Sequence, residues 1–320
     1  MLGILNNIKN IYFNLACEEF LLKQFKDDIF VIWQSEHSVV VGKHQNTLGE
    51  VNSHFLFHEN IPVARRLTGG GTVYHGPGNI NFSFIVNGER GKLVDFKKFM
   101  VPIIDFLNSK DIPALLGQRN EILLHGKKIS GNAEHVFKER VLHHGTLLFN
   151  ADLKILERVL EHRSHKYDDK AVQSVRTEVA NIQDHYLKDI NIDLFIDEFF
   201  NFLIDSYKAN IYCFNKSDLE EIKQLSNTKY RQWEWIFGYS PNFKVERQIE
   251  YLEQRLNILM KIEKGIITEI NCYGNIEGVK DKQIELLLLG SRFDYNKIKN
   301  KLKDSGINTK FINLLTSEIF

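Results

Sequence analysis

The chain has 320 residues, of which 43% are hydrophobic and 12% aromatic, so it has enough apolar side chains to build a folded core. Lys and Arg number 41, as do Asp and Glu, and this balance gives no general attraction to nucleic acid or to an acidic membrane surface. The widely spaced Cys17, Cys213 and Cys272 argue against a disulfide framework or a zinc knuckle. No apolar run approaches the ~18 residues that a membrane span needs. We therefore expect a globular cytoplasmic protein.

The elements predicted in the first two thirds of the chain mix helices and strands. Helices are predicted at residues 14–25, 97–107, 153–162 and 195–207, and strands at residues 29–33, 38–41, 79–86, 121–124, 128–130 and 141–149. Asn14 is a favourable N-cap for the first helix, and Glu18 and Glu19 suit the positive end of its dipole. Apolar residues alternate with Asn81 and Ser83, which is typical of a half-buried strand. Because a regular βαβ rhythm is absent, the pattern predicts an α+β fold.

The last third of the chain begins with a change of composition. Residues 226–244 are polar and aromatic, and residues 248–262 and 266–272 then flank Lys264-Gly265, a pattern typical of a β-hairpin. Residues 281–302 contain the last predicted helices. We therefore expect two domains, residues 1–245 and a small α/β accessory domain at residues 246–320.

The most informative segment reads RRLTGGGTVYH, from Arg65 to His75. Three consecutive glycines let backbone N–H groups converge on an anion, and two arginines can hold carboxylate or phosphate oxygens. The alternative is a tight hairpin with exposed arginines. Neither the P-loop pattern nor the dinucleotide-binding G-x-G-x-x-G pattern fits, so a nucleotide would be held in a different way.

A second segment places Lys128 among small residues, followed by His143 and His144. A lysine in this setting is most often a solvated strand end. Adjacent histidines on a strand point to opposite faces, so His143 and His144 cannot jointly chelate one metal ion. The absence of a G-x-S-x-G elbow argues against a serine hydrolase. We expect no metal site.

Together and in this order, these segments resemble the lipoate–protein ligase A family. The resemblance covers most of the chain. It also includes NLACEE at residues 14–19, Trp33-Gln34, residues 40–46, Arg119-Asn120, Ser174-Val175-Arg176 and Trp233-Glu234-Trp235.

The resemblance implies a catalytic domain of the class II biotin/lipoyl synthetase type with a C-terminal accessory domain. It implies that lipoate is activated by ATP to lipoyl-AMP and passed to a specific lysine of a lipoyl carrier domain. By similarity, Lys128 is catalytic and touches both the lipoate carboxyl and the α-phosphate. The residues implied to bind ATP are Arg66, Gly71, Thr72, Val73, Tyr74 and Lys128.

The resemblance also implies cofactors and partners. Mg²⁺ is expected as the counter-ion of ATP, without a dedicated protein site. The expected acceptors are lipoyl domains of 2-oxoacid dehydrogenase acyltransferase subunits and the glycine cleavage H protein, with no role for nucleic acid or membrane. We expect a monomer.

Physical arguments agree with these roles. A fixed cation relieves the repulsion between a carboxylate and a phosphate, and alternation along the strand turns Lys127 to the other face. As supporting hydrogen-bonding residues we expect Asn79, Asn120 and His144. Trp33, Val39 and Val41 are generic candidates for an apolar slot.

One departure from the family concerns the residues after His75. The ligases commonly carry Asp there, whereas this chain reads Gly76-Pro77-Gly78, as in octanoyl transferases that use a cysteine. At the position of that cysteine the chain has Ser174, which argues against an acyl-enzyme. Two alternatives stay open, a lipoyltransferase that uses preformed lipoyl-AMP and a non-catalytic protein that binds lipoyl domains.

Overall fold

The computed structural model describes residues 1–88, 93–160, 167–175, 177–186, 190–274, 276–277 and 279–320. Their contacts divide the chain into two compact units. The first unit consists of Met1–Lys43, Pro62–Leu156 and Ser174–Arg231, and the second of His44–Ile61, Glu157–Gln173 and Gln232–Phe320. None of the described helices combines the length and apolar character that crossing a membrane would require.

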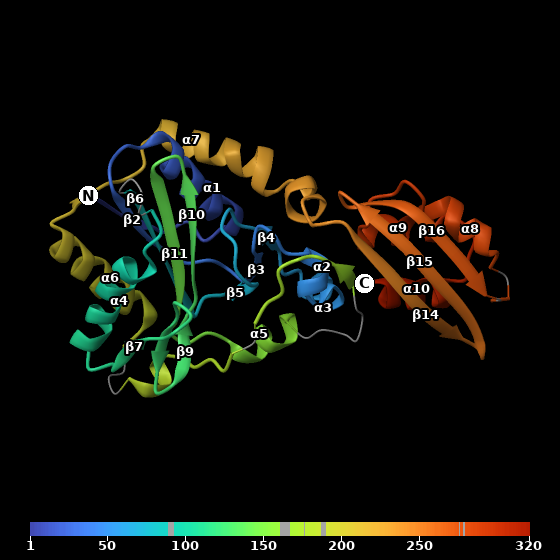
Figure 1. Ribbon diagram of the computed structural model, residues 1–320, viewed down its shortest axis with the longest axis horizontal. Coiled ribbons are helices and arrows are strands. Elements are labelled where there is room, and N and C mark those ends of the chain that lie inside the picture. Colours follow the sequence, from blue (N-terminus) through green and yellow to red (C-terminus); the bar gives the residue numbers. More distant parts are fainter. Residues whose placement is uncertain (89–92, 161–166, 176, 187–189, 275, 278) are drawn as a thin grey trace. The chain divides into compact units, whose positions relative to one another are not determined.

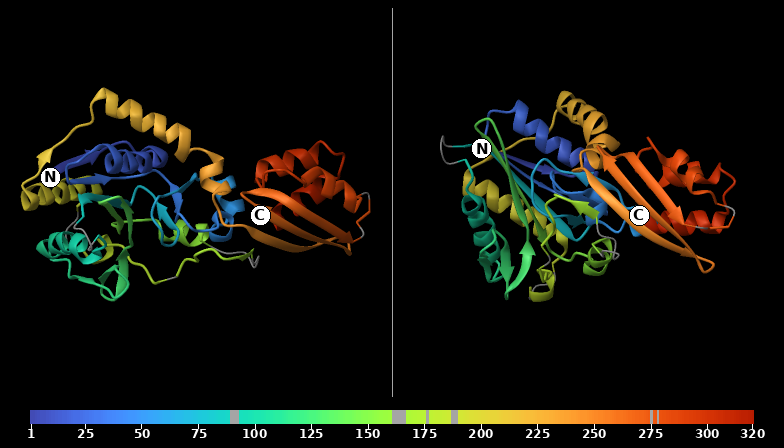
Figure 2. Two further views of the ribbon diagram at one scale, coloured as in Figure 1. Left: turned by 45° about the horizontal axis from the view of Figure 1, so that its top comes forward. Right: turned by 45° about the vertical axis from the view of Figure 1, so that its right-hand side comes forward.

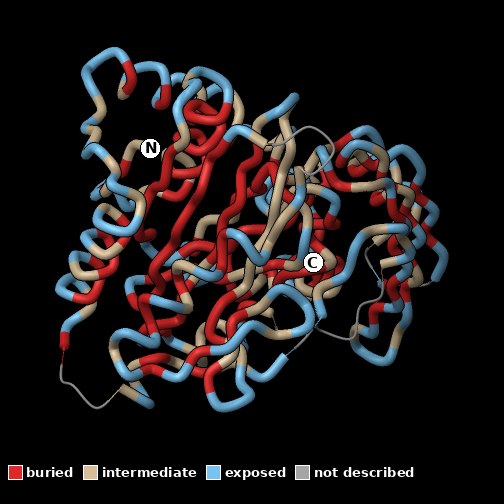
Figure 3. The backbone as a smooth tube through the Cα atoms, turned by 60° about the vertical axis from the view of Figure 1, so that its left-hand side comes forward, coloured by how far each residue is buried: buried red, intermediate tan, exposed pale blue. Residues whose placement is uncertain are grey.

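A mixed sheet forms the centre of the first unit (Figure 1). In spatial order its strands are β10 (Asn132–Phe137), β11 (Arg140–Leu148), β6 (Asn79–Asn87), β2 (Ile29–Trp33), β1 (Leu2–Asn6) and β13 (Asn210–Ile211). β1 runs parallel to its two neighbours, and the other pairs are antiparallel. The central strands are buried along most of their length (Figure 3).

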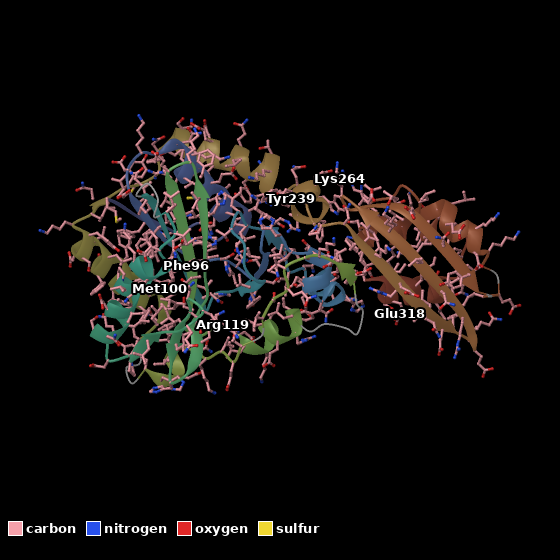
Figure 4. All side chains as sticks on the ribbon, in the orientation of Figure 1. Phe96, Met100, Arg119, Tyr239, Lys264 and Glu318 are labelled. Carbon is pink, nitrogen blue, oxygen red and sulfur yellow. The ribbon has the colours of Figure 1, made fainter. Side chains whose placement is uncertain are left out.

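Helices cover both faces of this sheet (Figure 2). α4 (Phe96–Ser109) and α6 (Ile192–Tyr207) pack on one face, where Phe82 and Phe84 belong to the same apolar core as both helices. Phe96 and Met100 lie on α4 (Figure 4). α1 (Ile11–Gln24) packs against β6 and β11 on the other face. α7 (Lys216–Leu225) and the π-helical turn η2 (Ser226–Tyr230) pack against α1. The strand predicted at 79–86 is confirmed, but because both faces of the sheet are covered, β6 is buried on both sides and the predicted half-burial is wrong.

The first helix begins earlier than predicted. Asn10 is its N-cap, and the Asn10 side chain accepts a hydrogen bond from the backbone N–H of Phe13 at 3.1 Å. Asn14 lies inside the helix and is buried. Glu18 and Glu19 therefore lie in the middle of the helix, where both are buried, and not in its first turn.

Two small sheets of the first unit carry the two sequence motifs. One has the order β4 (Val63–Arg65), β3 (Ser38–Val41), β5 (Val73–His75), and the other the order β7 (Ala114–Leu116), β8 (Ile122–Leu124), β9 (Lys127–Ser130). The glycine segment connects β4 to β5, and Lys128 lies on β9.

The remaining short helices in the described part of the chain are α2 (Thr47–Glu50), α3 (Ser53–His58), α5 (Leu153–Val159), η1 (Gln183–His185) and η3 (Glu234–Gly238).

The second unit has its own sheet and core. The sheet order is β12 (Tyr167–Asp169), β14 (Phe243–Tyr251), β15 (Gln254–Glu263), β16 (Ile266–Gly274), and the helices are α8 (Asp281–Leu288), α9 (Tyr295–Lys303) and α10 (Thr309–Ile319). The predicted Lys264-Gly265 hairpin is confirmed, with both residues at positive φ. A second turn, at Leu252 and Glu253, divides the segment predicted as one strand at 248–262. The prediction that the last helices end by residue 302 is wrong, because α10 follows.

The division expected after residue 245 falls inside β14. β14 pairs with β15 along its length, and β12 pairs with β14 although it lies far earlier in the sequence. Leu48 also belongs to the apolar core of the second unit. Segments from the middle of the chain therefore complete this unit.

Candidate active site

Arg66 is buried, and its guanidinium holds the glycine segment. Its Nη2 donates to the carbonyl oxygens of Gly69 at 2.6 Å and Gly71 at 2.7 Å, and its Nη1 donates to that of Val40 at 3.1 Å. Burial lowers the pKa of Arg66 to about 10, so it stays cationic at neutral pH. The side chain therefore shapes the loop and supplies a positive charge beneath it, and the alternative of an exposed hairpin arginine does not hold.

Arg65 is also buried, and its guanidinium donates hydrogen bonds to the backbone of the chain that follows β3. Its Nη1 donates to the carbonyl oxygens of Gly42 at 3.0 Å and Lys43 at 2.9 Å. The backbone N–H of Lys43 in turn donates to the carbonyl oxygen of Thr68 at 2.8 Å. Arg65 therefore fixes the chain that follows β3 against the end of β4, from which the glycine segment starts.

The three glycines have different conformational roles. Gly70 has φ +86°, in the left-handed region that favours glycine. A Cβ on Gly71 would lie 3.0 Å from Ser174 Oγ, whereas a Cβ on Gly69 would meet no heavy atom within 4 Å. Ser174 Oγ accepts a hydrogen bond from the backbone N–H of Thr72 at 2.9 Å. Ser174 therefore lies directly on the glycine segment.

A buried polar network ties this segment to the sheet. Thr68 Oγ1 accepts from Arg66 Nε at 2.8 Å and lies 2.8 Å from His144 Nε2. The other ring nitrogen of His144 lies 2.9 Å from Glu18 Oε1, which also accepts from Ser83 Oγ at 2.5 Å. All these contacts are satisfied together when His144 Nδ1 donates to Glu18 and Thr68 Oγ1 bonds both Arg66 and His144 Nε2. The network positions the loop.

Lys128 and Lys127 point to different surroundings, as the strand alternation predicts. Lys127 is exposed and pairs with Glu178 at 2.6 Å. Lys128 is partly buried, and its backbone is held on both sides: its N–H donates to the carbonyl of Glu178 at 3.0 Å, and its carbonyl accepts from Ala180 at 3.0 Å. The segment around residue 178 thus fixes Lys128.

The ammonium of Lys128 lies beside Gly131, and Ala133, two residues further on, lies beside Gly70 of the glycine segment. A Cβ on Gly131 would lie 3.3 Å from Lys128 Nζ, and a Cβ on Gly70 would lie 4.0 Å from that of Ala133, two residues after Gly131. Burial lowers the pKa of Lys128, and the nearby Arg66 cation lowers it further. Folding therefore brings a partly desolvated cation and a loop of backbone N–H groups together from segments about sixty residues apart.

Two regions of the chain match known families. Residues 10–204 match the lipoyl protein ligase A/B catalytic domain, and residues 240–320 match the bacterial lipoate protein ligase C-terminus. A lipoate–protein ligase of Staphylococcus aureus is 36% identical over 302 residues, which cover 93% of this chain and 92% of the relative. The chain belongs to the lipoate–protein ligase A family. It is a ligase enzyme.

Solved structures agree with this membership of the ligase family. A crystal structure of lipoate-protein ligase A bound with ATP has a TM-score of 0.64 and 25% identity, covering 75% of this chain and 100% of that one. A protein of T. acidophilum described as a lipoate protein ligase, with bound lipoic acid, has a TM-score of 0.63 and 25% identity, covering 74% and 100%. The α+β fold with a catalytic and a C-terminal domain is confirmed.

The remaining residues implied by the ligase resemblance lie around the same segment. Thr72 and Tyr74 are buried and Val73 is half-buried. The Tyr74 hydroxyl contacts His37 Nδ1, and burial raises the pKa of Tyr74 to about 12. Among these residues, backbone groups are therefore more available to a ligand than the Tyr74 hydroxyl.

The supporting residues differ in their placement. The Asn79 side chain accepts from the backbone N–H of Gly76 at 3.1 Å and donates to the carbonyl of Tyr74 at 3.3 Å, so it holds the Gly-Pro-Gly turn that departs from the family. Asn120 is exposed in a turn beside Arg119 (Figure 4), and its backbone oxygen accepts from Asn132. Arg176, from the Ser174-Val175-Arg176 segment that carries part of the resemblance, lies outside the described residues.

The apolar candidates are buried in the first unit. Trp33 Nε1 donates to Ser83 Oγ at 3.2 Å, and Val39 and Val41 are fully buried on β3. Among the described residues no group of three or more His, Cys, Asp or Glu side chains is placed to hold a metal ion. His143 bonds Glu134 at 2.9 Å on one side of the sheet, and the network of His144 lies on the other.

Sequence reasoning assigned no site role to Glu18, Thr68, Ser83 or Ser174. Glu18 and Ser174 lay within motifs that carried the resemblance, but their contacts come from distant segments. The one local signal was the acidic pair Glu18-Glu19 in a largely apolar stretch of the first helix.

Proposed function

We propose that this ligase uses ATP to activate lipoate as lipoyl-AMP and then transfers the lipoyl group to a specific lysine of a lipoyl carrier domain. In the first step a lipoate carboxylate oxygen attacks the α-phosphorus, and the bond to pyrophosphate breaks. In the second step the lysine amine attacks the acyl carbon, AMP leaves, and the amine loses a proton to form the amide. The observation that supports this reaction most directly is the partly buried Lys128 ammonium beside Gly131, two residues before Ala133, which lies beside Gly70 of the glycine segment.

Lys128 is the proposed catalytic residue, in contact with both the lipoate carboxyl and the α-phosphate. A fixed cation between two anions relieves their repulsion, and this is worth several kcal/mol where water is excluded. The ATP site comprises Arg66, Gly71, Thr72, Val73, Tyr74 and Lys128. Because the Thr72 N–H donates to Ser174, a phosphate that takes this donor displaces the Ser174 hydroxyl. Mg²⁺ arrives with ATP as its counter-ion.

We propose that the chain acts in the cytoplasm as a monomer. Its acceptors are lipoyl domains of 2-oxoacid dehydrogenase acyltransferase subunits and the glycine cleavage H protein. Neither nucleic acid nor a membrane takes part.

The C-terminal region is proposed as an accessory domain that moves between the half-reactions. Adenylation benefits from excluding water, whereas transfer requires that a protein lysine reach the same carbon. Deletion of residues 240–320, which removes all of β14, should slow adenylation more than transfer from supplied lipoyl-AMP. Equal loss of both half-reactions in a folded truncation would contradict this division.

The decisive experiment for the activity is lipoate-dependent exchange of pyrophosphate into ATP, together with lipoylation of an acceptor domain. Exchange and transfer by the wild type would support the full ligase. Transfer from supplied lipoyl-AMP without exchange would indicate the lipoyltransferase. Loss of both activities in a folded protein that still binds the acceptor would indicate a binding protein.

A further inference from the structure

Asn81 is a buried amide whose polar atoms have no hydrogen-bonding partner. The residue is 1% exposed, and neither Oδ1 nor Nδ2 has a partner among the described residues. Most buried polar side chains are hydrogen-bonded, because leaving one unpaired destabilises the fold. A buried amide without a hydrogen-bonding partner therefore indicates that a polar group of a ligand binds to it.

The position of Asn81 places it on the face of the sheet that carries the loop network. It lies on β6 opposite Trp33 on β2 and Thr146 on β11. Side chains alternate along a strand, so Phe82 points into the apolar core, and Asn81 shares its face with Ser83. Ser83 is the residue that donates to Glu18 in the network.

Lys128 reaches the same end of this sheet. The backbone N–H of Thr146 donates to the carbonyl oxygen of Gly131 at 3.1 Å, and the Lys128 ammonium lies over Gly131. Neighbouring strands are about 4.8 Å apart, so Asn81 lies about two strand spacings from Gly131. A carboxyl group held by Lys128 is thus within reach of an amide side chain at Asn81.

A second orphaned atom lies beside Trp33. His75 is 4% exposed, its ring contacts that of Trp33 with centroids 5.5 Å apart, and its Nδ1 has no partner among the described residues. Burial lowers the pKa of His75 to about 3, so the imidazole is neutral. Two neutral polar groups suit a carbonyl better than a phosphate, because an anion in a buried site requires charge compensation.

We propose that Asn81 is a substrate-contacting residue of the transfer step and that its Nδ2 donates to the carbonyl oxygen of the acyl-adenylate. This rests on the proposed function. When the acceptor lysine attacks, the C–N bond forms and the carbonyl electron pair moves onto the oxygen, where the amide stabilises the negative charge. Collapse then breaks the bond to AMP, and the amine proton is lost to water. Since Asn81 is covered, the substrate displaces the side chains above it when it binds.

The test compares Asn81→Ala with the wild type, using supplied lipoyl-AMP and an acceptor domain. Loss of a donor to a developing oxyanion should lower kcat for transfer about 10²–10³-fold, with little change in KM for lipoyl-AMP. Because no protein hydrogen bond is lost, the Tm should stay equal or rise. The matched variant Asn79→Ala, on the same face two residues away, loses two hydrogen bonds and should lower the Tm.

Asn81→Leu nearly keeps the volume, removes both the donors and the acceptor, and decides the question if the alanine variant does not fold. Unchanged kcat in a folded variant would overturn the proposal. A lowered Tm with unchanged kcat would indicate that the amide holds only a buried water, which also overturns it. A wild type without exchange or transfer would refute the proposed function and with it this inference, whereas an active wild type and an equally active Asn81→Ala would refute the inference alone.

Discussion

Thr68 Oγ1 lies 2.8 Å from His144 Nε2, although the two residues are 76 positions apart in the sequence. The same hydroxyl accepts from Arg66 Nε at 2.8 Å. One side chain therefore joins the arginine that shapes the glycine segment to the strand beneath it. His144 is in turn held by Glu18 from the first helix. The conformation of the proposed phosphate-binding loop thus depends on a buried contact with the sheet.

Thr68→Val keeps the shape of the side chain and removes this hydroxyl. Arg66 Nε and His144 Nε2 are then left buried without a partner, which should lower the free energy of unfolding by about 1–3 kcal/mol. A less ordered loop should raise KM for ATP in pyrophosphate exchange about tenfold, equivalent to about 1.4 kcal/mol. Thr68→Ser retains the hydroxyl and should resemble the wild type. A wild-type KM in the valine variant would show that the contact does not position the loop.

The three glycines should differ when each is replaced by alanine. Gly70→Ala forces an L-residue into the left-handed region, at about 1–2 kcal/mol. Gly71→Ala pushes against Ser174, which bonds the Thr72 N–H. Gly69→Ala meets no heavy atom and is not in the left-handed region, so its Tm should match the wild type. Thermal unfolding of the three variants checks this order, and equal Tm values for all three would contradict it.

Lys128→Ala should abolish adenylation in a folded protein, because the cation between the two reacting anions is lost. Lys127→Ala removes one exposed ion pair with Glu178, which is worth about 0–1 kcal/mol, and should be nearly silent. Pyrophosphate exchange and circular dichroism of both variants provide the measurement. If Lys127→Ala were inactive and Lys128→Ala active, the assignment of the catalytic role to Lys128 would be wrong.

The pH dependence of adenylation should reflect the lowered pKa of Lys128. Burial is the main cause, and Arg66 adds to it while Glu121 opposes it. The cation is the active form, so exchange should fall as the pH rises through this pKa, earlier than an ordinary lysine would titrate. In Lys128→Arg any residual exchange should keep its rate over that range, because arginine remains protonated. A profile for the wild type that stays flat up to the usual lysine pKa would refute the assignment.

Glu19 should make a pH-dependent contribution to stability. Its carboxylate accepts from Lys23 and Lys229, each at 2.6 Å, and from the Tyr230 hydroxyl at 2.7 Å. Burial alone would raise the pKa of Glu19, but these hydrogen bonds outweigh it and the pKa is lowered. A carboxyl whose pKa is lowered in the folded state stabilises the fold fully at pH values above its unfolded pKa, about 4.3. This stabilisation is lost as the pH falls through the folded pKa.

Glu19→Gln should therefore lower the free energy of unfolding by about 1.5–3 kcal/mol near pH 7. The difference in free energy of unfolding between this variant and the wild type should shrink as the solution becomes acidic. Denaturant unfolding at a series of pH values measures it. A gap of the same size at every pH would mean that the charge of Glu19 has no part in the contact.

The sequence alone determined the α+β class and the family, and it predicted that Lys127 and Lys128 face different surroundings. These features depend on local chemistry: glycines that free the backbone, turn residues such as Lys264-Gly265, and alternation along a strand. Local signals also located most helices and strands. They did not distinguish Asn10 from Asn14 as the N-cap, because both residue types cap helices equally well.

The tertiary structure alone decided which polar residues are buried and what they contact. Glu18 and Glu19 are adjacent on one helix, yet Glu18 holds His144 and Glu19 holds Lys229, from strands and turns far along the chain. The second unit likewise gathers residues 44–61 and 157–173 around its sheet. Burial and hydrogen bonding in the core depend on which distant segments meet, and a single sequence carries no local signal of those pairings.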